Sequence, residues 1–220
     1  MTRLAIFDCD GTLVDSGATI DRALRAAFAA HRLDCPPPSV SRKVIGLSLA
    51  EAMARLAPGC DHAALSRTYK EAFYAMRAGG QVEEPLFDGI LPLLDALEAE
   101  GWLLAVATGK SERGLRHCLE SHGLHRRFVS LQTADRHPGK PHPAMALAAI
   151  AESGVNAEAS VVIGDTSFDM GMAIAAGAGA IGAAWGYHDV DELTAAGAHG
   201  IAHQPSDVLA IVRQWVEKAA

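Results

Sequence analysis

Residues 6 to 16 read IFDCDGTLVDS, and the interpretation of the whole chain begins there. An apolar run typical of a buried strand, residues 4 to 8, leads into two acidic residues, Asp8 and Asp10. Side chains of extended chain alternate between faces, so these two share a face while Cys9 points the other way. Two carboxylates roughly 4 Å apart repel by about 4 kcal/mol at an effective dielectric of about 20. The pattern therefore predicts a divalent cation, or a shared proton, beside the pair.

The next two residues, Gly11 and Thr12, turn the chain sharply. Such a turn leaves backbone N–H groups free to point at an anion. An ordinary Asp-rich turn at the end of a strand is the simpler alternative. The choice between them depends on the rest of the chain.

The composition of the chain argues against two classes of binding partner. The chain has 220 residues, half of them apolar, and a net charge of −7 without a run of Lys or Arg. Nucleic acid and an anionic membrane both need a concentrated positive patch, so neither is expected as the main partner. The longest apolar stretch, residues 174 to 186, is too short and too rich in glycine to span a bilayer.

Cysteine usage indicates the compartment. The four cysteines show no Cys-x-x-Cys spacing, and the N-terminus runs directly into a strand without a signal segment. We expect a reducing, cytoplasmic setting.

The order of elements predicts an α/β fold with a helical insertion. Apolar residues at helical spacing predict helices at 19–31, 48–56 and 63–78. From residue 102 onward, predicted strands (103–108, 128–132, 160–164, 179–184) alternate with predicted helices (88–100, 112–122, 142–153, 168–176, 209–218). This alternation predicts a Rossmann-like, doubly wound parallel sheet. We assign residues 1–16 and 81–220 to the sheet domain and 17–80 to an all-helical cap, with hinges at 15–17 and 79–85.

Further polar signals follow the predicted strands. Thr108-Gly109-Lys110 ends one strand, and Asp165 follows another, with Asp169 four residues later at a helix start. Lys140 lies between them, in a loop that prolines make stiff. Ligands of open α/β sheets collect at the carboxyl ends of strands, which is where these residues fall.

Together these residues resemble the motifs of the haloacid dehalogenase superfamily of phosphohydrolases, in the branch similar to phosphoglycolate phosphatase. Residues 8–16 (DCDGTLVDS) match the first motif, 108–110 the second, Lys140 the third and 164–169 (GDTSFD) the fourth. The helical insertion resembles the four-helix cap of the family. The second motif departs at Gly109, where many relatives carry Asn.

The resemblance implies a mechanism. Asp8 would attack phosphorus and become an aspartyl phosphate, and Asp10 would act as the acid and then the base. Thr108, Gly109 and Lys140 would bind the phosphate. Mg²⁺ would be held by Asp8, the Asp10 main-chain carbonyl and Asp165, with Asp169 anchoring its water shell or Lys140.

The substrate would be a small phosphorylated metabolite, with 2-phosphoglycolate first and inorganic pyrophosphate or other small monoesters open. The cap segment 41–48 resembles the specificity loop of the family and contains Arg42, Lys43 and Gly46. We hypothesise that Arg42 or Lys43 pairs with a substrate carboxylate or second phosphate; two solvated charges are the alternative. His188 is a further candidate to border the site, and we expect a monomer or homodimer.

Other functions fit the sequence less well. A dehalogenase shares the fold but needs no metal, against which Asp10, Asp165 and Asp169 argue. A phosphomutase uses the same intermediate, but DGTLVDS resembles hydrolases more closely. A binding protein that has lost the chemistry is disfavoured because every motif residue is present.

Overall fold

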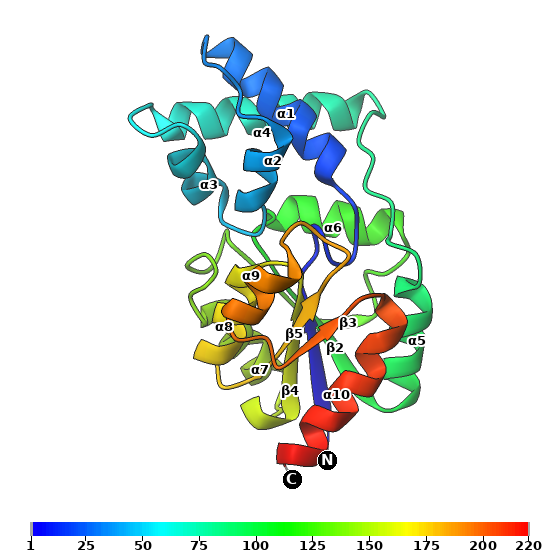
Figure 1. Cartoon of the computed structure of the whole chain (residues 1–220). Helices are drawn as coiled ribbons and strands as arrows, with labels where there is room; N and C mark the ends of the chain where they lie inside the picture. Colours follow the sequence, from blue (N-terminus) through cyan, green and yellow to red (C-terminus); the bar gives the residue numbers. More distant parts are fainter. Residues whose placement is uncertain (1, 220) are drawn as a thin grey trace.

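A six-stranded parallel sheet forms the lower half of the molecule (Figure 1). The computed structural model describes residues 2–219, with side chains to residue 217. The strands are β1 (Arg3–Phe7), β2 (Trp102–Thr108), β3 (Phe128–Thr133), β4 (Ser160–Gly164), β5 (Gly179–Ala183) and β6 (Gly200–Ala202). Their order is β3-β2-β1-β4-β5-β6, so β1 lies centrally between β2 and β4. The doubly wound parallel sheet predicted from the sequence is confirmed. The short edge strand β6 was not predicted.

Helices cover both faces of this sheet. One face carries α5 (Ile90–Ala99), α6 (Glu112–Ser121) and α10 (Pro205–Ala219); the other carries α7 (Ala144–Ser153), α8 (Ser167–Ala175) and α9 (Val190–Ala195). A single 3-10 turn, η2 (Ala157–Ala159), precedes β4. None of the helices within residues 2–219 combines the length and apolar character needed to cross a bilayer.

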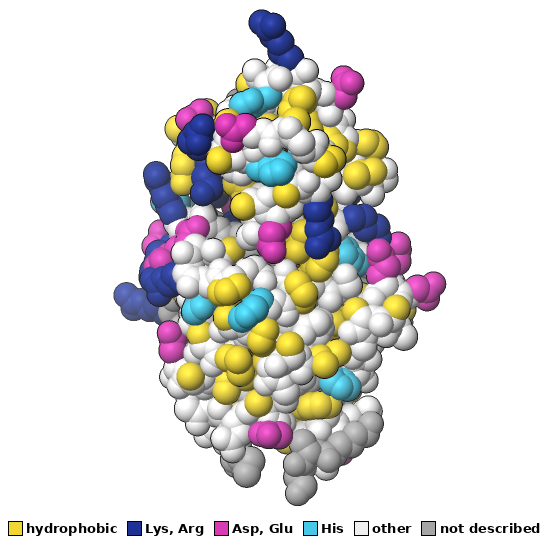
Figure 2. Space-filling view, turned by 90° about the vertical axis from the view of Figure 1, so that its left-hand side faces the viewer, with side chains coloured by type: hydrophobic (Ala, Val, Ile, Leu, Met, Phe, Trp, Pro, Cys, Tyr) yellow, Lys and Arg dark blue, Asp and Glu magenta, His cyan; other side chains and the backbone are white. Residues whose placement is uncertain are grey.

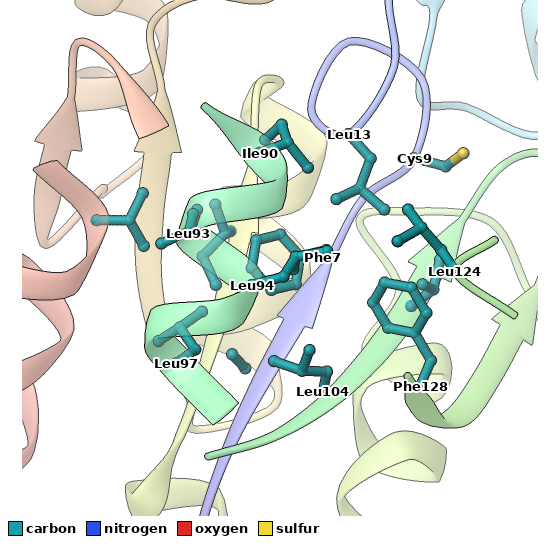
Figure 3. Close-up of a cluster of buried hydrophobic side chains, with 14 of the residues drawn as sticks. Phe7, Cys9, Leu13, Ile90, Leu93, Leu94, Leu97, Leu104, Leu124 and Phe128 are labelled. Carbon is teal, nitrogen blue, oxygen red and sulfur yellow. The ribbon is translucent and has the colours of Figure 1, made fainter. Parts of the chain in front are cut away.

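The central strand is buried on both sides because its alternate residues serve two cores. Ala5 and Phe7 pack with α5, whose side chains surround Phe7 (Figure 3). Leu4 and Ile6 face the opposite core, formed with α7 and α8. This two-sided burial explains why the strand is apolar from Leu4 to Phe7. It also fixes the strand end at which Asp8 emerges.

Four helices form a separate layer above the sheet (Figure 1). They are α1 (Gly17–Ala30), α2 (Pro38–Ser41), α3 (Leu49–Leu56) and α4 (His62–Ala78), with a 3-10 turn, η1 (Arg42–Val44), between α2 and α3. Their buried side chains form a hydrophobic cluster of their own, built around Phe28, Met53 and Leu65. Ser48 begins α3 with a reciprocal capping box, and Asp61 caps α4. We call this layer, residues 17–78, the cap.

The two chain connections between cap and core lie side by side. The Asp15 amide donates to the Pro85 carbonyl at 2.9 Å, and the Thr19 hydroxyl donates to the Glu83 carbonyl at 2.8 Å. The two connections are therefore tied together by hydrogen bonds; we call residues 15–19 and 79–85 the hinge strip. The division into 1–16 with 81–220 and 17–80 stays a prediction; both of its boundaries fall at this strip.

The cap rests on the core through the loop after η1. A Cβ atom at position 109 would lie 2.4 Å from the Leu47 carbonyl oxygen and 2.8 Å from that of Gly46. Only glycine allows so close an approach, which explains the departure at Gly109. Lys43 forms ion pairs with Asp189, at 3.0 Å, and with Glu192 of the core. Charged side chains of both signs gather at the level where the cap meets the core (Figure 2).

A methyl group at position 109 should push the cap away from the core. Gly109→Ala is expected to raise the radius of gyration in small-angle scattering and to speed proteolysis in the hinge strip, because Cβ clashes with the cap backbone. Gly114→Ala is the control, since its Cβ would meet only side-chain atoms, the Ser111 hydroxyl at 3.1 Å and Lys110 Cγ at 3.2 Å, and no cap backbone. Identical scattering for Gly109→Ala and wild type would contradict the close contact.

Candidate active site

The sequence motifs converge at the carboxyl edge of the sheet. Asp8 directly follows β1, Thr108 ends β2 and Asp165 directly follows β4. These three strands are neighbours in the sheet, so their ends open on one place. The structure therefore brings these residues to one edge of the sheet, and their role as a common functional site stays a prediction.

Lys140 forms the centre of a buried ion cluster. Its Nζ lies 2.9 Å from Asp8 Oδ1 and 2.6 Å from Asp169 Oδ1. All three side chains are essentially inaccessible to solvent, at 1% exposure or less. Of the two sequence-based roles for Asp169, the structure shows the one in which it anchors Lys140. The other Asp169 oxygen accepts from the Thr166 hydroxyl, at 2.6 Å, and from its amide.

Asp165 is held in place by two hydrogen bonds and by close packing against two glycines. Its oxygens accept from the Thr12 hydroxyl at 2.8 Å and from the Tyr187 amide at 2.9 Å. Cβ atoms at positions 11 and 186 would each lie 2.2 Å from this side chain. Two glycines therefore make room for the carboxylate, and Gly11 has a φ of +89° that also favours glycine.

Three carboxylates form a potential cation site. One oxygen each of Asp8, Asp165 and Asp169 can be chosen so that all lie within 4.8 Å of one another, and all three residues are buried. Asp8 Oδ2 is buried without a hydrogen-bond donor. An oxygen-only donor set with one free carboxylate oxygen fits Mg²⁺. These three charges face the single ammonium of Lys140, so a divalent cation would balance the site.

The Asp10 side chain does not join this cluster. Its Oδ1 accepts from the Ser16 hydroxyl at 2.6 Å and from Lys110 Nζ at 2.7 Å. A different lysine lies beside each carboxylate, Lys140 beside Asp8 and Lys110 beside Asp10, and the cation expected beside the pair stays a prediction. Metal binding through the Asp10 main-chain carbonyl stays a prediction.

Burial shifts the titration of the cluster in the absence of a cation. Desolvation raises the pKa of Asp8 to about 7, against the opposing effect of Lys140. It also raises the pKa of Asp165 well above its ordinary range, with Asp8 adding to the shift. Burial alone would lower the pKa of Lys140, but the Asp169 and Asp8 charges hold it above its ordinary value. A protonated lysine is thus fixed beside a carboxyl group that needs positive charge to ionise.

A chain of ion pairs runs from Asp10 to the cap. Lys110 Nζ, besides contacting Asp10, lies 2.8 Å from Glu84 Oε1, and Glu84 pairs with Arg77 of α4 at 3.2 Å. The Lys110 and Glu84 side chains are 8% and 6% exposed. Sequence analysis missed both roles. The position of Lys110 directly after Thr108-Gly109 was the available signal for one, but nothing in the sequence marks Glu84.

The Thr108 side chain lies at the floor of a cavity between core and cap. This cavity has a volume of about 560 Å³ and is bordered by α1, α3, α4 and the connection from β2 to α6. Asp10, Thr108, Gly109 and Gly46 line it, as expected for residues around a bound substrate. The structure therefore brings motif residues and cap into one enclosure.

Arg42 and Lys43 do not line this cavity. Arg42 pairs with Asp21 of α1 at 3.2 Å, and Lys43 pairs with Asp189 and Glu192. The hypothesis that one of them binds a substrate carboxylate is not supported by this arrangement, since both already have carboxylate partners. Sequence alone does not show those partners, which come from distant segments.

His188 links the cap loop to the core. Its Nδ1 accepts from the Ser167 amide at 3.2 Å, and its Nε2 lies 3.3 Å from the Lys43 carbonyl oxygen. Burial lowers its pKa, which favours the neutral ring that these bonds require. It borders the motif at α8 without lining the cavity.

Comparison with known proteins agrees with this geometry. Residues 5–183 match the model of the haloacid dehalogenase-like hydrolases. The chain is 37% identical over 202 residues to a probable phosphatase, IndB, of Dickeya dadantii, covering 89% of this chain and 87% of that protein. It is 33% identical over 192 residues to a phosphoglycolate phosphatase of Xylella fastidiosa, covering 86% and 83%.

A solved structure extends the likeness to the fold. A haloacid dehalogenase-like hydrolase of Streptococcus pneumoniae superposes with a TM-score of 0.84 at 26% identity, over 95% of this chain and 97% of that one. The match to the family model covers most of the sheet and the whole cap. By sequence, by fold and by the order of its motifs, the chain belongs to the haloacid dehalogenase-like hydrolases.

Proposed function

We propose that the protein is a Mg²⁺-dependent phosphatase that hydrolyses phosphate monoesters through an aspartyl phosphate on Asp8. The observation that carries this proposal is the buried contact of Asp8 with Lys140, next to two further carboxylates. The names of the two relatives, a probable phosphatase and a phosphoglycolate phosphatase, support the same reaction class.

The first step is attack by Asp8. A carboxylate oxygen forms a bond to phosphorus while the ester P–O bond breaks and the leaving oxygen takes the electron pair. Lys140 and the Thr108 hydroxyl would bind oxygens of the transferring group, whose negative charge would otherwise repel Asp8. Mg²⁺, held by Asp8, Asp165 and Asp169 or their water shell, would supply further positive charge when bound.

Asp10 serves as acid and then as base. It protonates the leaving oxygen and afterwards, as a carboxylate, takes a proton from the water that attacks phosphorus. This second attack breaks the bond to Asp8, releases phosphate and regenerates both carboxyl groups. Lys110 and Ser16 both donate to Oδ1 of Asp10 and so fix the orientation of its side chain.

Phosphate release tests the proposal. Wild-type protein is expected to release inorganic phosphate with Mg²⁺ from p-nitrophenyl phosphate, a monoester, and from acetyl phosphate, an activated acyl phosphate, and to lose both activities in EDTA. Asp8→Asn should lower kcat by about 10³-fold or more, because an amide is a poor nucleophile. Asp15→Asn, an exposed neighbour in the same motif, is the control. Equal activity of Asp8→Asn and wild type would contradict the proposal.

Lys110 is expected to act as a positioning residue for Asp10. Lys110→Met should lower kcat by about 10²-fold, within the range of a misplaced general acid, with a smaller effect on KM. Lys110→Arg keeps the charge and should recover part of the loss. An unchanged kcat for Lys110→Met would show that Asp10 needs no such partner.

The raised pKa of Asp8 predicts a pH-dependent stability of the metal-free protein. Between pH 3.8 and about pH 7, Asp8 keeps its proton in the folded chain but has released it in the unfolded chain. The free energy of unfolding therefore falls as pH rises through this window. In EDTA, Tm should drop between pH 5 and pH 8, and added Mg²⁺ should restore more of it at pH 8.

The matched control for this experiment is Asp8→Asn. Its dependence of Tm on pH should be weaker, and the comparison cancels other groups such as His188, whose lowered pKa acts in the opposite direction. About 1 kcal/mol corresponds to roughly 2–4 °C for a chain of this length. If Tm depends on pH equally in wild type and in Asp8→Asn, burial does not raise the pKa of Asp8 as stated.

A further inference from the structure

We propose that the cavity between cap and core binds an apolar, aromatic leaving group of about bicyclic size, so that the substrates are bulky phosphate esters rather than 2-phosphoglycolate. This inference rests on the proposed function, because it concerns the group from which the phosphoryl unit is taken. It is carried by the volume of the cavity, its side chains and the pairing of its charges.

The volume exceeds what a two-carbon acid fills. The cavity measures about 560 Å³. A glycolate unit takes up on the order of three water volumes, about 90 Å³. Pockets of roughly 300–1,000 Å³ are typical for ligands of drug size. A leaving group with two fused rings would use the space between the cap helices, which glycolate would leave to water.

The side chains around the space are mainly apolar. The part contributed by the cap includes Leu24 of α1, Met53 and Leu56 of α3, and Tyr69 and Phe73 of α4. Leu24 and Met53 are buried at 4% and 0% exposure, so they form a fixed wall. Tyr69 and Phe73 are one helical turn apart, with ring centroids 6.1 Å from each other. Two aromatic faces on one helix suit a planar ring system.

The buried positive charges near the reacting end are already neutralised. Lys110 contacts both Asp10 and Glu84, and Arg77 pairs with Glu84. The remaining lysine and arginine side chains that line the cavity, Lys70 and Arg113, are exposed, so they belong to its outer edge. Two histidines also line it: His117 is exposed, and His137 is hydrogen-bonded to Gln132. Within the described residues, the inner cavity thus offers no unpaired cation for the carboxylate of a glycolate group.

Polar residues of the core line one part of the cavity, and Glu51, Lys70 and Arg113 add exposed polar groups to its lining. Asp10, Thr108 and Lys110 lie where the ester bond would be held, next to the Asp8 cluster. Beyond them the apolar cap residues begin. A substrate of matching polarity has its phosphate at one end and an apolar body at the other, and the body gains by leaving water.

A comparison of three substrates tests the inference. Naphthalen-2-ylmethyl phosphate and 2-phosphoglycolate are both esters of aliphatic alcohols, so they differ chiefly in the body of the leaving group. We expect kcat/KM for the naphthyl ester to be roughly tenfold higher or more, through burial of its rings. A preference for 2-phosphoglycolate would overturn the inference and leave the proposed function standing. Failure to hydrolyse any of the three compounds, the two monoesters and acetyl phosphate, would overturn both.

Two alanines of α3 provide a matched pair of variants. Ala52 lines the cavity, whereas Ala54 is exposed on the same helix and does not. Ala52→Phe should lower kcat/KM for the naphthyl ester by roughly tenfold, because the added ring occupies the same space. Its hydrolysis of acetyl phosphate should stay within about twofold of wild type, which also shows that the variant folds. Ala54→Phe should change neither.

Product inhibition gives a second readout on the unaltered protein. Naphthalen-2-ylmethanol should inhibit wild type competitively and Ala52→Phe more weakly, whereas glycolate should not inhibit wild type at matched concentration. Inhibition by glycolate alone, or an equal loss of both hydrolytic activities in Ala52→Phe, would overturn the inference.

Discussion

The burial of Asp8, Asp165 and Asp169 around the single ammonium of Lys140 is the constraint on which the rest of the structure depends. Charges this deep in a protein are strongly unfavourable unless they are paired. One lysine cannot balance the charge of three carboxylates, so the cluster would stabilise additional bound positive charge. Asp8, the proposed nucleophile, is therefore held at a point where a cation and a phosphoryl group would relieve the same charge imbalance.

The order of the strands in the sheet brings the residues of this cluster together. Apolar β1 is sandwiched between β2 and β4, and Asp8, Thr108 and Asp165 appear where these three strands end. The cap is inserted directly after this point, and its two connections are hydrogen-bonded to each other. The reacting end and the cavity thus have separate origins. The sheet supplies the charged cluster, and the helices supply the apolar walls.

Most of the sheet and of the charged cluster could be predicted from the sequence. The spacing of apolar residues and the order of the motifs are both visible in short stretches of chain. Alternation of apolar runs gave the sheet except for β6, whose three residues are too few to show a period. The Asp8, Lys140 and Asp165 assembly followed from the resemblance. The Lys110–Glu84 contact and the pairing of Lys43 with Asp189 and Glu192 could not be predicted, because they join segments far apart in the chain. The size of the cavity likewise depends on packing that no motif encodes.

The most direct measurement of the central claim is chemical trapping at Asp8. The protein is mixed with Mg²⁺ and acetyl phosphate, quenched with acid during turnover and reduced with borohydride, which converts an aspartyl phosphate to homoserine. The account predicts homoserine at position 8 by peptide mass spectrometry, with Asp10 and Asp165 unmodified. Turnover that continues while Asp8 is never converted would contradict it.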